Sequence, residues 1–321
     1  MIKKYVQLIE AEIKKQKFGS EPTSLYEPIR YIMGLGGKRL RPLLTLLSYS
    51  FYKRDAQNIV RYASAIEAFH NFTLLHDDIM DKAPLRRGKP TVHEKWNVNT
   101  AILSGDVMLV RVYDLFLSLE GKKLKAVLKL FNMCAAEVCE GQQWDMEFEA
   151  KSKVSEGQYI EMIRLKTAVL LGFSLELGAL LAAAPEEERK ALKDFGVNIG
   201  IGFQLKDDLL DVYADKKKFG KQVGGDIVAN KKTFLFIKAK EKAKGKDKVE
   251  LEKWLKATKF NKQKKIEAVT ALYNKLGIPQ ATEKKIGFYF EKGFAKLEKI
   301  KNSQAKKRLI EFTKDLINRQ V

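Results

Sequence analysis

Apolar residues recur every three or four positions through almost the whole chain, which is the spacing of one face of an α-helix. The clearest helical stretches cover residues 57–81, 125–150 and 159–183, and another leads from Phe195 to Tyr213. No stretch alternates strictly between apolar and polar residues, as a half-buried strand would. The pattern therefore predicts an all-α protein.

The domain organisation follows from length and composition. A chain of 321 residues has room for two domains. However, only seven Pro occur, and no Ser/Gly-rich linker, low-complexity run or fixed-period repeat divides the sequence. We therefore expect residues 1–321 to form a single helical domain.

Charge is concentrated in the last third of the chain. The formal net charge is +20, and residues 216–321 hold 30 Lys and Arg against 11 Asp and Glu. A nucleic-acid partner, an anionic membrane and a lysine-coated surface in solvent all agree with this excess. Charge alone does not choose among them.

Cysteine usage and hydropathy bear on the cellular compartment. Cys134 and Cys139 are five positions apart in an apolar helical stretch and are predicted to be buried free thiols, which fits a reducing compartment. The N-terminal region has the pattern of a charged amphipathic helix and not of a secretory signal. No uncharged apolar run reaches the roughly 18 residues of a membrane span. We expect a cytoplasmic protein with no membrane span, and a peripheral membrane contact stays open.

One acidic pentad occurs twice, as DDIMD at residues 77–81 and DDLLD at residues 207–211. Because residues four apart share a helix face, Asp77 and Asp81 repel each other, as do Asp207 and Asp211. A cation would relieve this repulsion, and Mg²⁺ is usually held by one or two carboxylates together with substrate phosphates. The pentads therefore predict a polyphosphate bound through magnesium.

Two basic segments add candidate phosphate ligands. Lys38 and Arg41 follow a glycine turn at the start of a predicted helix, where unpaired N–H groups favour anions. Arg86 and Arg87 lie in the loop after Asp81, and guanidinium groups match phosphate oxygens well. Solvated basic side chains, or ion pairs with the nearby carboxylates, remain the alternatives.

The helix over residues 57–81 carries further candidates. His70 and Thr73 fall near the stripe of Asp77, and His70 lies roughly 10 Å below that carboxylate along the helix axis. Phe72, five residues before Asp77, lies about 7.5 Å below it. Packing in the protein core is the alternative for both rings.

Polar residues also interrupt the apolar helical pattern in the second half of the chain. Lys166 and Thr167 break an apolar helical pattern, and a buried Lys needs an anion or a dipole. Gln204 shares the helix face of Asp207. A loop rich in Lys and Gly then covers residues 216–226 and closes at residues 230–233. Its glycine hinges would suit a lid over a phosphate substrate, whereas an ordinary solvated connection is the alternative.

In this order, the motifs resemble those of the trans-isoprenyl diphosphate synthases. The set is specific as a whole, whereas a single DDxxD pentad would be weak: Gly36-Gly37-Lys38-Arg39-Leu40-Arg41-Pro42, both pentads, Arg86-Arg87-Gly88-Lys89-Pro90-Thr91, Gly141-Gln142, Lys166-Thr167, Gly202-Phe203-Gln204 and Gly220-Lys221. The resemblance implies a bundle of mostly antiparallel helices around a deep central cavity, usually a homodimer, with the pentads facing each other at its mouth.

The resemblance also implies ligands for each substrate. Asp77 and Asp81 would bind two Mg²⁺ ions and Asp207 a third, with Asp78, Asp208 and Asp211 in support. Arg86, Lys166 and Lys221 would hold an allylic diphosphate, and Lys231 would belong to the closing lid. Isopentenyl diphosphate would be held by Lys38, Arg41, His70 and Arg87.

The implied reaction is a head-to-tail condensation through an allylic carbocation. Thr167 and Gln204 would steady the cation by their dipoles, and the departing diphosphate would act as the base. In the family, a bulky residue at the position of Phe72 stops chain growth, and the smaller Thr73 follows it. The first pentad also lacks the two-residue insertion of many bacterial farnesyl synthases. Together with Phe72, this favours geranylgeranyl diphosphate as the product over farnesyl diphosphate or longer chains.

Two rival functions explain less of the sequence. A class I terpene cyclase normally carries an NSE-type motif in place of the second pentad. A basic nucleic-acid-binding protein would account for the charged last third but would leave acidic pentads beside a phosphate backbone. We therefore expect no nucleic-acid partner.

Overall fold

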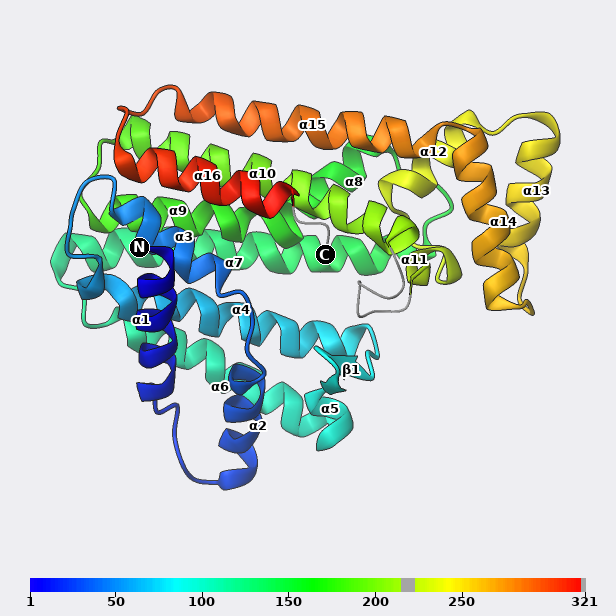
Figure 1. Cartoon of the computed structure of the whole chain (residues 1–321). Helices are drawn as coiled ribbons and strands as arrows, with labels where there is room; N and C mark the ends of the chain where they lie inside the picture. Colours follow the sequence, from blue (N-terminus) through cyan, green and yellow to red (C-terminus); the bar gives the residue numbers. More distant parts are fainter. Residues whose placement is uncertain (215–222, 319–321) are drawn as a thin grey trace. The chain divides into compact units, whose positions relative to one another are not determined.

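The computed structural model describes residues 1–214 and 223–318, which are mostly helical (Figure 1). The chain divides into two compact units. Unit 1 contains Met1–Cys134, Leu170–Lys193 and Lys299–Glu311, and unit 2 contains Ala135–Val169, Asp194–Glu298 and the segment from Phe312. Four of the described helices have residues in both units, namely α7 (Gly121–Ala150), α9 (Val169–Leu181, of which only Val169 belongs to unit 2), α10 (Glu186–Tyr213) and α16 (Gln304–Asn318). The prediction of a single domain stays a prediction.

Unit 1 is built around α4 (Val60–Met80), which packs against α6 (Val98–Phe116) and α3 (Leu40–Tyr49). Gly105 of α6 allows close approach, because a Cβ there would lie 2.3 Å from Nε2 of His76. Phe131 joins the buried aromatic core, with its ring centroid 5.1 Å from that of Phe69 and 5.5 Å from that of Phe116. The remaining elements are α1 (Ile2–Lys15), α2 (Thr23–Gly34), the 3₁₀ turn η1 (Ala56–Ile59), α5 (Val92–Lys95) and α9 (Val169–Leu181).

Unit 2 has its own apolar core, in which Leu235, Leu251, Val269 and Ile278 are buried. Side-chain caps begin several of its helices, and Ser155 and Gln158 form a reciprocal capping box. Besides its share of α7, α9, α10 and α16, the unit contains α8 (Glu156–Ile163), the π-helical segment η2 (Arg164–Ala168), α11 (Gly225–Val228), α12 (Phe234–Lys242), α13 (Gly245–Lys256), α14 (Lys262–Lys275) and α15 (Ile278–Leu297).

The all-α prediction is confirmed, and the described residues contain only two short strands. β1 (Leu85–Arg86) and β2 (Lys89–Pro90) pair as an antiparallel hairpin. The helix expected over residues 159–183 is a series of three elements, because the π-helical segment η2 separates α8 from α9. Spacing alone does not reveal one extra residue inserted into a helical turn.

Two expectations about single features have different outcomes. Cys134 is buried as predicted, whereas Cys139 is exposed, so the prediction of two buried thiols is wrong for Cys139. Residues five apart point in different directions from a helix, and only one of the two faces the core. Among the described residues, no helix is long and apolar enough to cross a membrane.

Candidate active site

The first acidic pentad lies at the C-terminal end of α4 in unit 1. Asp77 and Asp78 belong to the last helical turn, and Asp81 is the C-cap, with its backbone N–H donating to the carbonyl of Asp77 at 2.8 Å. The helical turn thus continues to Asp81, which keeps Asp77 and Asp81 on one face. Asp78 points elsewhere and is only 2% exposed. The pentad therefore divides into the buried carboxylate of Asp78, the partly exposed carboxylate of Asp77 and the exposed residue Asp81.

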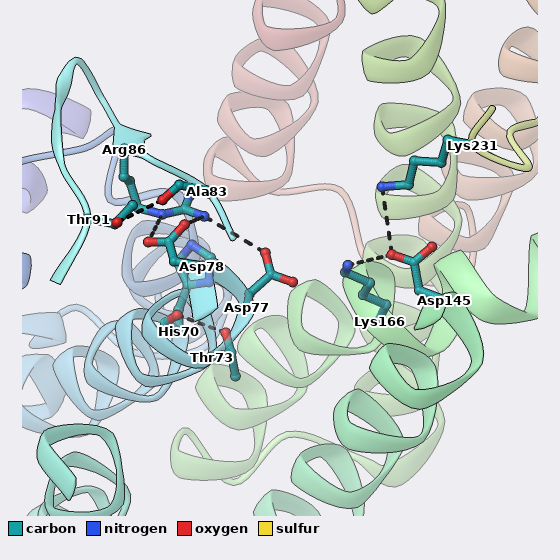
Figure 2. Close-up of polar contacts among 10 residues, drawn as sticks. All are labelled: His70, Thr73, Asp77, Asp78, Ala83, Arg86, Thr91, Asp145, Lys166 and Lys231. Atoms are coloured by element: carbon teal, nitrogen blue, oxygen red, sulfur yellow. Dashed lines mark hydrogen bonds and ion pairs between the residues drawn. The ribbon is translucent and has the colours of Figure 1, made fainter. Parts of the chain in front are cut away.

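Arg86, in the β1–β2 hairpin, forms a bidentate pair with the buried carboxylate of Asp78 (Figure 2). Nε lies 2.8 Å from Oδ2 and Nη2 lies 2.7 Å from Oδ1 of Asp78, whereas Nη2 is 3.8 Å from Oδ2 of Asp77. Burial raises the pKa of Asp78, and the two bonds from Arg86 oppose that rise. Thr91 closes the hairpin by donating to the carbonyl of Ala83 at 2.7 Å. Asp78 therefore anchors the basic hairpin to the end of α4.

Arg41, His70 and Arg87 form a second group in unit 1. Burial lowers the pKa of Arg41, and the positive charge of Arg87 adds to that effect. Burial, followed by the charges of Arg41 and Arg87, lowers the pKa of His70 well below its ordinary value, so the imidazole is neutral. In the described residues, Nε of Arg41 is buried without a hydrogen-bond partner. This combination favours a bound anion, which would supply the missing acceptor and negative charge.

The backbone of a glycine turn contacts Arg87 of this group. Gly36 and Gly37 have φ values of +77° and +145°, a region that side chains rarely adopt. Nη1 of Arg87 donates to the carbonyl of Gly36, and a Cβ on Gly37 would lie 3.0 Å from Nη2 of Arg87. Lys38 follows on the exposed part of the turn. The glycines thus let the backbone approach the guanidinium group closely.

Arg39, between the two expected ligands Lys38 and Arg41, points inward and is 3% exposed. Its guanidinium group binds Glu67 at 2.9 Å, Glu10 at 2.8 Å and the carbonyl of Met33 at 3.0 Å. Sequence reasoning gave no role to Arg39 or Glu67. Arg39 has a left-handed backbone conformation, with φ of +47°, which was not visible in the spacing.

Phe72 and Thr73 are placed by local contacts. The ring of Phe72 is 8% exposed and lies 4.8 Å from His76 and 5.7 Å from Phe69, centroid to centroid. The hydroxyl of Thr73 donates to the carbonyl of His70 at 2.8 Å (Figure 2). Phe72 is therefore a core residue, and a role of its ring in chain length stays a prediction.

The second pentad lies on α10 in unit 2, and its three carboxylates have different surroundings. Asp207 is exposed, whereas Asp208 is 7% exposed. Asp208 accepts hydrogen bonds from the hydroxyl of Tyr159 and from Nε2 of Gln204, the latter at 3.0 Å. Burial, and then the charge of Asp226, raise the pKa of Asp208 to about 7. Oδ2 of Asp211 accepts the backbone N–H of Asp226 at 3.0 Å.

The π-helical segment η2 carries Lys166 and Thr167. Nζ of Lys166 lies 2.7 Å from Oδ2 of Asp145, and Nζ of Lys231 lies 3.7 Å from the same oxygen (Figure 2). Thr167 donates to Oε1 of Gln204 at 3.2 Å. The expected anion for Lys166 is therefore Asp145. The sequence signal for Asp145 was its place one helical turn after Gly141, on the same face of α7.

Gly141 explains how η2 reaches α7. A Cβ at this position would lie 2.2 Å from the backbone nitrogen of Lys166. No side chain fits at that distance, so the glycine allows η2 to lie directly against the helix that carries Asp145. This contact brings the ammonium group of Lys166 to the carboxylate.

The donor sets suit magnesium. In the part of the chain that the structure describes, no group of three or more His, Cys, Asp or Glu side chains converges as a closed metal cage. Mg²⁺ needs hard oxygen ligands and is commonly held by one or two carboxylates with substrate phosphates and waters. The pairs Asp77 and Asp81, and Asp207 and Asp211, match that requirement. Lys221, an expected phosphate ligand, lies outside the described residues.

Comparisons with known proteins show the family to which the chain belongs. The family model for polyprenyl synthetase matches residues 22–273. The chain is 38% identical to a geranylgeranyl pyrophosphate synthase of Geoglobus acetivorans, with 99% of this chain and 98% of that protein covered. It is 43% identical to a short chain isoprenyl diphosphate synthase of Methanocaldococcus jannaschii over 74% of this chain and 72% of that protein.

A crystal structure of a geranylgeranyl pyrophosphate synthase resembles the whole chain, with a TM-score of 0.95 and 43% identity. The similarity covers 100% of this chain and 99% of that one. The motifs, the fold and these matches have one explanation: the chain belongs to the polyprenyl synthetase family.

Proposed function

We propose that the protein condenses isopentenyl diphosphate head-to-tail with an allylic diphosphate and releases diphosphate. The observation that carries the proposal is the buried Nε of Arg41, which lacks a hydrogen-bond partner among the described residues and lies in a group with Arg87 and neutral His70. This group is in the same unit as the first pentad. An anion site beside a hard-cation site suits a reaction between two diphosphates. The names of the similar synthases support the same activity.

Isopentenyl diphosphate is proposed to bind at the basic group. Arg41 and Arg87 would take the diphosphate oxygens, and Nε of Arg41 would gain the acceptor it lacks. Neutral His70 can donate one hydrogen bond without adding charge. Lys38, on the exposed part of the glycine turn, would close over the outer oxygens. Its flexible ammonium group suits a point-charge contact.

The allylic diphosphate is proposed to bind through the pentads. Asp77 and Asp81 would hold two Mg²⁺ ions and Asp207 a third, while Asp78, Asp208 and Asp211 support these carboxylates. When bound, the ions supply electrophilic stabilisation of the leaving diphosphate.

Basic side chains are proposed to assist at this diphosphate. Lys166 and Lys231 both approach the carboxylate of Asp145, so two ammonium groups lie together where they could contact a diphosphate. The pair with Asp78 uses two of the five N–H groups of Arg86, and the others can serve the substrate. Lys221 is proposed as a further ligand.

Thr167 and Gln204 are proposed to stabilise the allylic cation. The hydroxyl of Thr167 donates to Oε1 of Gln204, and Nε2 of Gln204 donates to Asp208. These bonds fix the direction of both dipoles before the reaction, which avoids reorientation as positive charge develops. The departing diphosphate would then take the proton that restores the double bond. No separate side-chain base is required.

The product is proposed to be geranylgeranyl diphosphate. Phe72 lies five residues before Asp77 on α4, about 7.5 Å along the helix, where its ring would limit the growing chain. Thr73, next to it, is smaller. Farnesyl diphosphate or a longer product is the alternative, and the experiment below separates them. We also propose a cytoplasmic homodimer without a nucleic-acid partner.

The test is a product assay. Purified protein, Mg²⁺ and labelled isopentenyl diphosphate are incubated with dimethylallyl, geranyl or farnesyl diphosphate, and the prenyl products are separated by chain length. We expect geranylgeranyl diphosphate, and we expect Asp77→Ala and Asp207→Ala each to remove at least about 99% of the rate, as loss of a main charge-stabilising ligand does. Asp315→Ala, at an exposed position of α16, is the matched control. Absence of product with every primer would reject the proposal.

A further inference from the structure

Lys265 of α14 is a buried lysine to which the proposed reaction gives no role. Its side chain is fully buried, with 0% of the residue exposed. Nζ donates to the carbonyl of Val228 at 3.2 Å and to Oδ1 of Asn230 at 2.7 Å. The same nitrogen lies 4.3 Å from the ring centroid of Phe260. The ammonium group is therefore held inside unit 2 by two hydrogen bonds and a ring contact.

This arrangement is costly for a core residue. Within the described residues, the acceptors of Lys265 are oxygens without formal charge, and it makes no ion pair. Burial lowers its pKa, which reports the desolvation of the charged form. A buried ammonium group without a carboxylate destabilises the fold unless its hydrogen bonds repay the lost hydration. Apolar side chains fill such a position at lower cost, so the bonds to Val228 and Asn230 need an explanation.

Both acceptors belong to one short segment, residues 224–231. Val228 is the last residue of α11, so Lys265 places a positive charge at the carboxyl end of that turn. Asn230 has φ of +54°, and its Nδ2 donates to the carbonyl of Leu255 at 3.1 Å. Its side chain is thus held from α14 and from α13 at once. These bonds fix an unfavourable backbone conformation in the residue that precedes Lys231.

The two ends of this segment reach the proposed site. At one end, the backbone N–H of Asp226 donates to Oδ2 of Asp211 in the second pentad at 3.0 Å. At the other, the N–H of Lys231 donates to the carbonyl of Asp226 at 2.9 Å, and Nζ of Lys231 approaches Asp145. A displacement of the segment would therefore move a pentad contact and a phosphate ligand together.

We propose that Lys265 is a positioning residue, which clamps residues 224–231 so that Lys231 and Asp226 are held at the allylic diphosphate site. Lys265 itself contacts no reacting group. The inference rests on the proposed function for its kinetic consequence, whereas its structural part can be measured without turnover.

The kinetic test compares Lys265→Met with Lys264→Met. Lys264 is the exposed neighbour on α14, so its variant controls for the loss of one positive charge. We expect Lys265→Met to raise KM for the allylic diphosphate about ten-fold, in line with the loss of one hydrogen bond to a charged group. KM for isopentenyl diphosphate, whose proposed ligands lie in unit 1, should change less than about two-fold. Equal changes in both constants would contradict the proposal.

A double-mutant cycle tests whether Lys265 acts through Lys231. In the Lys231→Ala background, Lys265→Met should have less than half of its effect on allylic KM, because the group that it positions is gone. Full additivity would overturn the proposal. Asn230→Gly is a second variant that keeps the positive φ accessible and removes the amide acceptor. It should reproduce the selective rise in allylic KM, and it decides the question if Lys265→Met does not fold.

Hydrogen exchange separates this proposal from the proposed function. The backbone amides of Asp226 and Lys231 should exchange at least about ten-fold faster in Lys265→Met than in wild type or Lys264→Met, because their segment opens locally. Inactive wild-type protein with this exchange pattern would reject the proposed function and retain the clamp. Active wild-type protein with unchanged exchange in the variant would reject the clamp alone.

Discussion

Asp208 gives the sharpest prediction on pH dependence. Its pKa of about 7 in the folded protein contrasts with an ordinary value of 3.8, chiefly because the carboxylate is buried and lies near Asp226. Between these two pH values the folded protein holds a proton that the unfolded chain has released. The free energy of unfolding therefore falls as pH rises from about 4 to about 7, and this contribution becomes constant above pH 7.

The size of the effect follows from the difference in pKa. Three pKa units at about 1.4 kcal/mol each correspond to a loss of about 4 kcal/mol. Asp208→Asn removes this contribution because the amide does not titrate. The amide also places an N–H₂ group against a donor from Tyr159 or Gln204, which costs about 1–3 kcal/mol at every pH. The free energy of unfolding of the variant, relative to that of wild type, is therefore lower at low pH than at high pH.

The assay measures urea unfolding of both proteins by circular dichroism from about pH 4 to pH 8. EDTA is present because a bound divalent cation would itself stabilise the carboxylate. The variant's free energy of unfolding minus that of wild type should rise by about 4 kcal/mol across this range. Asp194→Asn, at a partly solvated position of the same helix, is the control. A difference for Asp208→Asn that stays constant with pH would refute the reasoning.

Three further changes test other contacts. Phe72→Ala should lengthen the prenyl product by at least one isoprene unit, measured by chromatography, and an unchanged product would mean that another residue sets the chain length. Because the ring is buried, the same change should lower the free energy of unfolding by about 3–5 kcal/mol. Arg86→Met should cost about 3 kcal/mol in urea unfolding by stranding the charge of Asp78, and adding Asp78→Asn should recover most of it. Gly141→Ala should displace the backbone of Lys166 and raise allylic KM at least about ten-fold, whereas Gly157→Ala, at an open position, should not.

Local sequence patterns predicted the fold class and identified most of the candidate site residues. Helical spacing predicted an all-α protein because the burial of one helix face imposes a period near 3.6 wherever it occurs. The ordered motifs located the family, since the chemistry of a diphosphate and Mg²⁺ needs carboxylates and basic groups whatever their packing. Asp145 and Tyr159 were not assigned, because their roles depend on partners 21 and 49 residues away in the chain.

The sequence by itself determined which residue types were present for the chemistry and which helices carried them. Only the tertiary structure decided how each charge was used. Asp77 and Asp78 are adjacent aspartates, yet Asp78 is buried against Arg86 whereas Asp77 remains partly exposed. Arg39 and Arg41 are two residues apart, yet Arg39 is paired with Glu10 and Glu67, whereas Nε of Arg41 is buried without a hydrogen-bond partner among the described residues. Burial and long-range pairing set the free energy of a charge, and neither property is encoded in its immediate neighbours.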